Sequence, residues 1–256
     1  MNADNATYLY CLVRSSRAPD TKNAPAGLPN LSRARVLDAG EGLWLVVADA
    51  PLAEYDRAPI EARMQDLEWI SVRALAHEAV IDHLLEAGTV IPMRLFTLFR
   101  DDQRALRHIE NDRARLERIL ARIDGCLEWG LRVQLSARSD THDRSRDGKE
   151  PPPASGREFL LRKKEQFAGR RAHKERAHER AERIYAELAS KAAESVRRPV
   201  DPNTDRSLLE AAFLVSSDAV HAFRATADEA RAAAIEDGCD AVLTGPWPAF
   251  HFIERE

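Results

Sequence analysis

The chain has 256 residues, of which 44% are hydrophobic and 31% are charged, and its formal net charge is −4. These proportions are typical of a soluble globular protein and exclude a mainly disordered chain. The longest apolar run, residues 43–48, is far shorter than the roughly 20 residues of a membrane-spanning helix, so no membrane partner is expected.

The cysteines and the start of the chain bear on the cellular compartment. Cys11, Cys126 and Cys239 are odd in number and far apart, which argues against a disulfide scaffold and gives no metal-finger spacing. The first residues lack the basic segment and the apolar segment of a secretory signal. We therefore expect a protein of the reducing cytoplasm that uses no metal and no other cofactor.

The first half of the chain alternates between strand and helix patterns. The predicted elements are strands at residues 7–13, 35–38, 43–48 and 89–99, and helices at residues 59–86 and 101–123. Aromatic and branched residues fill the first strand without polar alternation, which predicts burial on both of its faces. Pro92 lies inside the last strand and places that strand at a sheet edge or a bulge.

The second half has the pattern strand, helix, strand, helix, strand. The predicted elements are strands at residues 127–136, 208–215 and 240–244, and helices at residues 156–196 and 218–237. The long helix is apolar near both ends, whereas residues 169–180 carry only alanines among charged residues. We therefore expect buried ends and a middle that is either solvated or kinked at Gly169. Residues 245–252 are predicted to form a stiff, aromatic, non-helical tail.

These patterns predict an α+β protein of two domains. The first is a mixed α/β domain at residues 1–126, and the second spans residues 127–256 with a flexible loop at residues 138–156. The order of elements in the second domain suits a ferredoxin-like sheet built from a split βαβ unit, although one strand of that pattern is not visible.

The search for catalytic motifs finds no P-loop, no G-x-S-x-G and no H-E-x-x-H. His77 lies on the apolar face of its helix, and no second ligand stands at a suitable spacing, which favours a core histidine over a catalytic group or metal ligand. Arg94 interrupts an apolar strand. It could grip a carboxylate or a partner's backbone, or it could form a structural ion pair with an acid of the first helix.

A basic stretch and an aromatic tail remain. Residues 157–183 carry 10 basic and 5 acidic side chains, the pattern of a nucleic-acid interface. The isoelectric point of 6.1 and the interspersed acids favour a solvated face instead. In the tail, Trp247, Phe250 and Phe252 either pack back over a sheet or offer a partner a rigid apolar surface, and packing back is favoured.

Four segments together carry a resemblance to a known family. They are Tyr8-Leu9-Tyr10-Cys11-Leu12-Val13, Thr89-Val90-Ile91-Pro92-Met93-Arg94-Leu95-Phe96-Thr97, Leu208-Leu209-Glu210-Ala211-Ala212-Phe213-Leu214-Val215 and Thr244-Gly245-Pro246-Trp247-Pro248-Ala249-Phe250-His251-Phe252. In this order and spacing they resemble the gas vesicle protein F/L family over nearly the whole chain. One departure is that family members commonly have Arg-Phe-Gly-Thr where this chain has Arg94-Leu95-Phe96-Thr97.

The resemblance implies a non-enzymatic accessory protein of gas vesicle formation, whose C-terminal domain is a variant ferredoxin-like fold. It implies contact with the small hydrophobic shell protein, whose nucleation or assembly it assists, and with other gas vesicle accessory proteins. It implies a cytoplasmic location associated with gas vesicles and no nucleic-acid partner. Binding an apolar shell protein calls for an apolar surface or an exposed sheet edge. The candidate partner-binding or structural residues are Arg94, Phe96, Trp247, Phe250 and Phe252.

Two other functions stay open at this point. A ferredoxin-like domain can carry a small-molecule enzyme or sensor site, which would show as a deep pocket with two or more convergent titratable groups. A nucleic-acid binder using the helix at residues 157–183 would bind any duplex with a steep dependence on salt.

Overall fold

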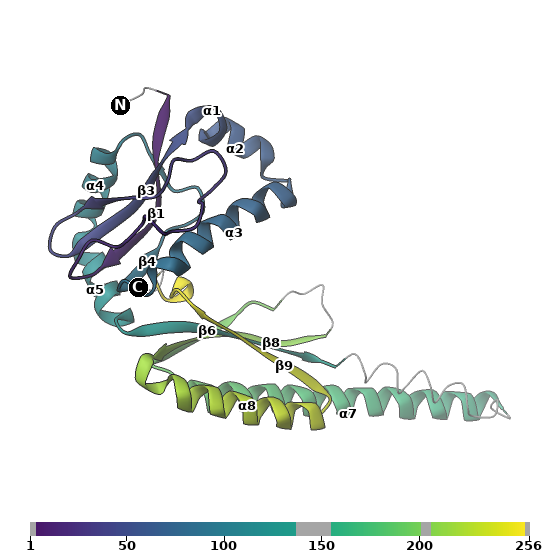
Figure 1. Ribbon diagram of the computed structural model, residues 1–256. Coiled ribbons are helices and arrows are strands. Elements are labelled where there is room, and N and C mark those ends of the chain that lie inside the picture. Colours follow the sequence, from purple (N-terminus) through teal and green to yellow (C-terminus); the bar gives the residue numbers. More distant parts are fainter. Residues whose placement is uncertain (1–3, 137–154, 201–205, 254–256) are drawn as a thin grey trace. The chain divides into compact units, whose positions relative to one another are not determined.

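The computed structural model describes residues 4–136, 155–200 and 206–253 and is a mixed α/β structure with two antiparallel sheets (Figure 1). The chain forms two compact units, residues 1–125 together with 247–256, and residues 126–246. The domain boundaries at 1–126 and 127–256 stay a prediction, and the compact units differ from them in placing the tail with the first unit. Almost all of the loop predicted at residues 138–156 lies outside the described residues.

A five-stranded sheet forms the centre of the first unit. Its strands are β1 (Asn5–Arg14), β2 (Arg35–Asp38), β3 (Leu43–Pro51), β4 (Thr89–Pro92) and β5 (Leu98–Phe99). Their order is β2-β3-β1-β4, and β5 pairs with β1 at Thr7 and Tyr8. The prediction that the first strand is buried on both faces is confirmed, because residues 6–13 are all buried.

Helices cover this sheet. They are α1 (Leu52–Tyr55), α2 (Arg57–Arg63), α3 (Leu67–Leu84), α4 (Asp102–Asn111) and α5 (Arg113–Ile123). On one face, Val80, Ile81 and Leu84 of α3 pack against Tyr8 and Tyr10 of β1. Figure 1 shows α4 and α5 on the other side of β1 and β3. The central strand therefore meets apolar side chains on both faces, which explains its unbroken apolar sequence.

Three elements that the sequence predicts as continuous are broken. The helix at residues 59–86 breaks before Asp66, whose carboxylate accepts a hydrogen bond from the Trp69 N–H at 3.0 Å and so caps α3. The helix at residues 101–123 breaks at Asp112, between α4 and α5. The strand at residues 89–99 breaks into β4 and β5, and residues 93–97 between them form a loop that lies beside the candidate site.

The second unit has a four-stranded sheet with two helices on one face (Figure 1). Its elements are β6 (Cys126–Leu135), α7 (Gly156–Ala189), β7 (Glu194–Arg198), β8 (Ser207–Ser216), α8 (Val220–Glu236) and β9 (Cys239–Trp247). The strand order β7-β8-β6-β9 is that of a split βαβ arrangement. The strand that the sequence pattern lacks is β7, which sequence analysis assigned to the end of the long helix.

Small residues let the helices approach the sheet of the second unit closely. Trp129, Leu131 and Val133 alternate along β6 and point to the core. The side chains that α7 and α8 place in this core are Ala177, Ala181, Ile184, Leu188, Phe223, Ala227, Ala230 and Ala234. Their spacing of three or four residues keeps them on one face of each helix.

The burial of α7 differs from the sequence-based expectation. The residues expected to be solvated include Ala177, which is fully buried. The apolar residues near the start of the helix, expected to be buried, are exposed instead: Phe159, Leu160, Leu161 and Phe167. The physical reason is visible in Figure 1, where the first half of α7 runs beyond the end of the sheet and of α8 and has nothing to pack against in the described part of its unit.

Candidate interaction site

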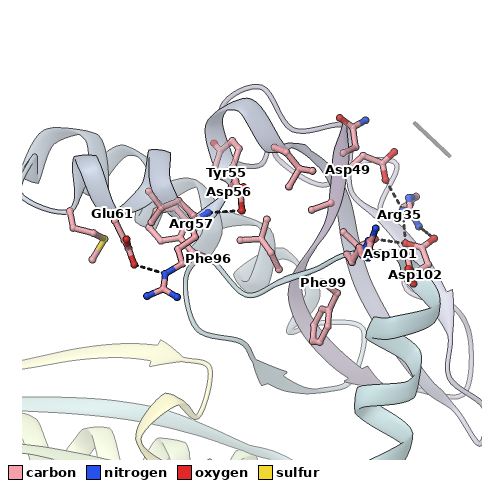
Figure 2. A pocket seen from close by; sticks show the side chains of 18 residues that line it. Arg35, Asp49, Tyr55, Asp56, Arg57, Glu61, Phe96, Phe99, Asp101 and Asp102 are labelled. Atoms are coloured by element: carbon pink, nitrogen blue, oxygen red, sulfur yellow. Dashed lines mark hydrogen bonds and ion pairs between the residues drawn. The ribbon is translucent and has the colours of Figure 1, made fainter. Parts of the chain in front are cut away.

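A cavity of about 1140 Å³ lies in the first unit, where α1 and α2 face the segment at residues 96–102 across the start of β1 (Figure 2). Its apolar wall is formed by Leu52, Tyr55, Ile60, Met64, Phe96, Leu98 and Phe99. Charged residues stand at its two ends. Arg35, Asp49 and Asp102 lie at one end, and Arg57 and Glu61 lie at the other. The cavity is therefore a groove with an apolar centre and polar ends.

Phe96 holds an unusual backbone position in the wall of this groove. Its φ of 66° lies in the left-handed region, which costs a residue other than glycine about 1–2 kcal/mol. The ring is stacked on Trp69 with centroids 5.4 Å apart and lies 6.5 Å from the ring of Tyr55. Aromatic packing of this kind offsets part of the backbone cost.

A buried hydrogen-bond relay holds the loop that carries Phe96. The Phe96 N–H donates to the Tyr8 hydroxyl at 3.4 Å, and that hydroxyl can donate to Nδ1 of His77 at 2.8 Å. Nε2 of His77 then carries the proton and donates to the carbonyl oxygen of Met93 at 3.0 Å. Both ends of the loop, Met93 and Phe96, are thus tied through Tyr8 and His77 to the sheet and to α3.

Burial keeps this relay neutral. It lowers the pKa of His77, because the imidazolium would lose its hydration, and it raises the pKa of Tyr8 well above its usual range. Tyr10, whose ring is stacked on His77 with centroids 5.6 Å apart, has its pKa raised by burial to about 12. The interpretation of His77 as a core histidine is confirmed, because its side chain is buried and makes two hydrogen bonds.

Arg73 completes the aromatic cluster behind Phe96. Its guanidinium lies 3.9 Å from the ring centroid of Trp69 and 5.6 Å from that of Tyr55. It is buried, donates to the Trp69 carbonyl at 3.3 Å and lies 3.8 Å from the Glu54 carboxylate. A buried cation held over two aromatic faces fixes the position of both rings. The wall of the groove is therefore preorganised.

An ion-pair network forms the end of the groove at which Arg35, Asp49 and Asp102 lie. Arg35 donates to both carboxylate oxygens of Asp102, each at 2.9 Å, and to Asp49 at 2.7 Å (Figure 2). Thr7 adds a hydrogen bond to Asp102 at 2.8 Å. The Arg35 guanidinium holds the pKa of Asp102 below its usual range, and Asp102 in turn raises the pKa of Arg35. Both groups therefore stay charged at neutral pH.

Asp102→Asn is expected to lower the free energy of unfolding by about 1 kcal/mol at pH 7, because this bidentate pair is partly exposed to solvent. The pair stabilises the fold above the ordinary carboxyl pKa of 3.8, and this contribution is lost as the pH falls through the lower pKa of folded Asp102. Urea unfolding of both proteins at pH 7 and pH 3 measures the difference. Glu61→Gln, which breaks an exposed pair, is the control and should show no measurable change. Equal stability of Asp102→Asn and the unsubstituted protein at pH 7 would contradict the network's role.

The residues singled out from the sequence do not form one site. Phe96 lies in the groove wall, whereas Arg94 is exposed and stands in the loop after β4 rather than inside an apolar strand. The Arg94 carbonyl accepts hydrogen bonds from the Thr97 N–H at 3.1 Å and the Thr97 hydroxyl at 2.7 Å, which close the turn leading to β5. The side chain reaches outward because residues 93–97 have left the sheet.

The aromatic tail packs back only in part. Phe252 is fully buried, and its carbonyl accepts a hydrogen bond from Arg122 of α5. Phe250 is half-buried against the core of the first unit. Trp247, expected to be the buried anchor, is 40% exposed. The tail also contains a short helical turn where none was expected, since Phe250–Phe252 form one 3-10 turn, η2.

Other functional features of the described residues are few. No group of three or more His, Cys, Asp or Glu side chains there is arranged to hold a metal ion. None of the described helices combines the length and the apolar character that a bilayer crossing needs. In the basic stretch, Arg171 pairs with Glu175, Arg180 with Asp237, and Glu182 with Arg197. Of these pairs, Arg180–Asp237 joins a base of the stretch to an acid elsewhere in the chain, which agrees with the interpretation of a solvated face for that residue.

Sequence reasoning missed most of the groove. Tyr55, Trp69 and Arg73 lie on α1 and α3, and their meeting with Phe96 depends on the fold. Nothing in the sequence around Asp102 indicates its ion pair, because its partner Arg35 lies 67 residues away along the chain. Phe96 was singled out only because it lies in the segment at residues 89–97 that carries the family resemblance.

Comparison with known proteins agrees with this architecture. The sequence model of the family described as gas vesicle synthesis protein GvpL/GvpF matches residues 6–254. Gas vesicle protein L of Streptomyces sp. (strain CB03234) is 32% identical over 259 residues, which cover 98% of this chain and 94% of the relative.

Two solved structures have the same fold. The gas vesicle protein GvpF from Anabaena sp. PCC7120 superposes with a TM-score of 0.68 at 13% identity, covering 98% of this chain and 97% of that one. The gas vesicle protein GvpF from Microcystis aeruginosa gives a TM-score of 0.64 at 17% identity, with 98% and 99% covered.

Proposed function

The chain belongs to the GvpL/GvpF family of gas vesicle synthesis proteins, and we propose that within gas vesicle formation it acts as a non-enzymatic accessory protein that binds the small hydrophobic shell protein. A role in gas vesicle formation follows from the family. The proposal is that the chain binds the shell protein and other accessory proteins. This binding would take place in the cytoplasm, at the growing vesicle.

The groove of the first unit carries this proposal. Its centre is apolar and its wall is held rigid by the Tyr8–His77 relay and by the Arg73 cluster. A preformed apolar groove binds an apolar segment at a low entropic cost, because few side chains must be ordered on binding. The charged groups at the two ends can meet the polar residues that flank such a segment.

The carboxylates around the groove argue for binding rather than for catalysis. A small-molecule enzyme would need convergent titratable groups, and five carboxylates do line the cavity: Asp49, Asp56, Glu61, Asp101 and Asp102. Each of them has a structural partner. Asp49 and Asp102 pair with Arg35, Glu61 pairs with Arg57, and Asp56 and Asp101 accept backbone N–H groups at helix starts. Carboxylates engaged in this way position the chain and are poorly placed to transfer protons near neutral pH.

Met64→Asp is expected to abolish retention of the shell protein. Met64 is exposed and lines the groove, so a carboxylate there would have to be desolvated when an apolar segment docks. The two proteins are expressed together, and the amount of shell protein that co-purifies is measured at modest salt. We expect a decrease of at least roughly tenfold, as for loss of an interface hot spot.

Leu75→Asp is the matched control, since Leu75 is an exposed apolar residue of α3 that does not line the groove. Its retention of shell protein should equal that of the unsubstituted chain. Circular dichroism melting curves establish that both variants are folded. Equal retention by Met64→Asp and Leu75→Asp would contradict the groove, and no retention by the unsubstituted chain would contradict shell-protein binding itself.

A further inference from the structure

The exposed start of α7 is a second apolar surface, far along the chain from the groove. Leu160 is 67% exposed and Phe167 is 61% exposed, although both belong to the same helix whose second half is buried in the core of its unit. Figure 1 shows this part of α7 projecting beyond its own sheet. The buried half anchors the helix, so the exposed half is presented as a rigid rod.

Helical geometry arranges the charges of this rod around an apolar stripe. At about 100° per residue, Leu160 and Phe167 lie almost on one line, about a quarter turn from the face that packs on the sheet. Basic residues stand on both sides of that line: Lys163 and Lys174 on one side, Lys164 and Arg171 on the other. A shallow groove of about 680 Å³ continues the line from Phe167 to His178 and Leu208, and Glu175 and Glu179 line it beyond the basic residues.

The flanking cations are exposed, as interface charges at the rim of a helix pair are. Arg171 has its guanidinium 2.8 Å from Glu175, and the Lys163 amine lies 5.6 Å from the ring centroid of Phe159. Both arrangements are open to solvent and can be exchanged for a partner's carboxylates. An apolar seam with charges on both sides is the geometry by which one helix recognises another.

We propose that the start of α7 binds an amphipathic helix of a partner protein whose apolar face is flanked by glutamate or aspartate. The basic residues on both sides of the stripe favour a partner helix that carries acidic residues. Two copies of α7 pairing along the stripe, parallel or antiparallel, would place lysine and arginine of one copy against lysine and arginine of the other.

The chain's own segments outside the described residues are equally unsuited to cover the stripe. Residues 137–154 and 201–205 contain no Leu, Ile, Val, Met, Phe, Tyr or Trp. They can offer charges to the rim, yet they have no apolar side chain of the size that Leu160 and Phe167 would bury. These two segments therefore cannot supply the apolar occupant, which favours a partner protein. The stripe belongs to the second unit, whereas the groove belongs to the first.

The probe for this interface is a fluorescein-labelled synthetic helical peptide of about three heptads, with Leu at the a and d positions and Glu at the e and g positions. Fluorescence anisotropy is expected to show saturable binding to the full chain, weakened as salt is added. Phe167→Ser should weaken it at least roughly tenfold. Ile235→Ser, which removes a 63% exposed side chain from α8, is the matched control and should leave binding unchanged. Hydrogen exchange should slow at residues 159–174 when the peptide binds.

Several outcomes would overturn the proposal. One is equal binding of a peptide with the same residues in scrambled order, or of a peptide with Lys at the e and g positions. Another is tighter association with phosphatidylglycerol vesicles or duplex RNA than with the acidic peptide, which would assign the basic stripe to a membrane surface or to nucleic acid. A third is self-association in sedimentation equilibrium that Phe167→Ser abolishes, because the occupant would then be a second copy.

Discussion

Phe252→Ala is expected to lower the free energy of unfolding of the first unit by about 3–5 kcal/mol, the usual cost of truncating a buried phenylalanine. Phe252 is fully buried although it stands in the tail of the chain. Its backbone is held as well, since its carbonyl accepts a hydrogen bond from Arg122 and the neighbouring Ile253 carbonyl accepts one from Arg115 at 3.4 Å. The tail is thus a structural part of the first unit.

Chemical denaturation monitored by circular dichroism measures this loss. Trp247→Ala provides the contrast within the same tail, because Trp247 is partly exposed and its replacement should cost less than about 1 kcal/mol. If Trp247 serves a partner, its replacement should lower retention of the shell protein while melting is preserved. A larger loss of stability for Trp247→Ala than for Phe252→Ala would contradict this account of the tail.

His77→Leu is expected to cost about 2–4 kcal/mol at pH 7. Leucine can fill much of the volume, but it leaves the buried Tyr8 hydroxyl without its acceptor and the partly buried Met93 carbonyl without its donor. Because the same relay holds the loop that carries Phe96, the substitution should also reduce retention of the shell protein at the groove. Tyr8→Phe in combination with His77→Leu should cost less than the sum of the two single changes.

The pH dependence of stability tests the relay separately. Burial lowers the pKa of His77 below its unfolded value of 6.5, so the unfolded chain takes up a proton at mildly acidic pH while the folded chain does not. The stability of the unsubstituted protein therefore falls as the pH drops below about 6.5, and this loss levels off once the pH is below the folded pKa. The other histidines contribute equally to both proteins, so the difference between the unsubstituted chain and His77→Leu isolates His77. A difference that stays constant from pH 7.5 to pH 4.5 would show that His77 is not buried in the neutral state.

Local sequence patterns predict much of the fold. The strands β1, β3 and β8 are rich in apolar residues, most of which are buried, so their pattern is unambiguous. The helix α8 ends where Gly238 stands with a positive φ, which is the usual signal at a helix end. The family resemblance also rests on these segments, and the match over residues 6–254 confirms it.

The sequence did not predict the breaks within the helices and strands. In sequence, Asp66 and Asp112 look like any polar residue on a helix surface. In the structure, the Asp66 side chain caps α3, whereas the Asp112 side chain makes no capping hydrogen bond to α5. The strand β7 has the sequence Glu-Ser-Val-Arg-Arg, which carries almost no apolar signal because it lies at a sheet edge and is largely open to solvent.

The exposure of side chains along α7 depends on where the sheet that it covers ends. The apolar residues at the start of α7 resemble those of its buried end, but a helix of 34 residues is longer than the sheet that it covers, so one end packs and the other projects. The groove was decided by contacts between distant residues: Arg35 meets Asp102, and Tyr8 meets His77, across 67 and 69 positions of the chain. The neighbouring residues in the sequence set a residue's helix or strand propensity and the face of that element on which it lies. A partner at such a distance comes into contact only once the sheet has brought the two elements together.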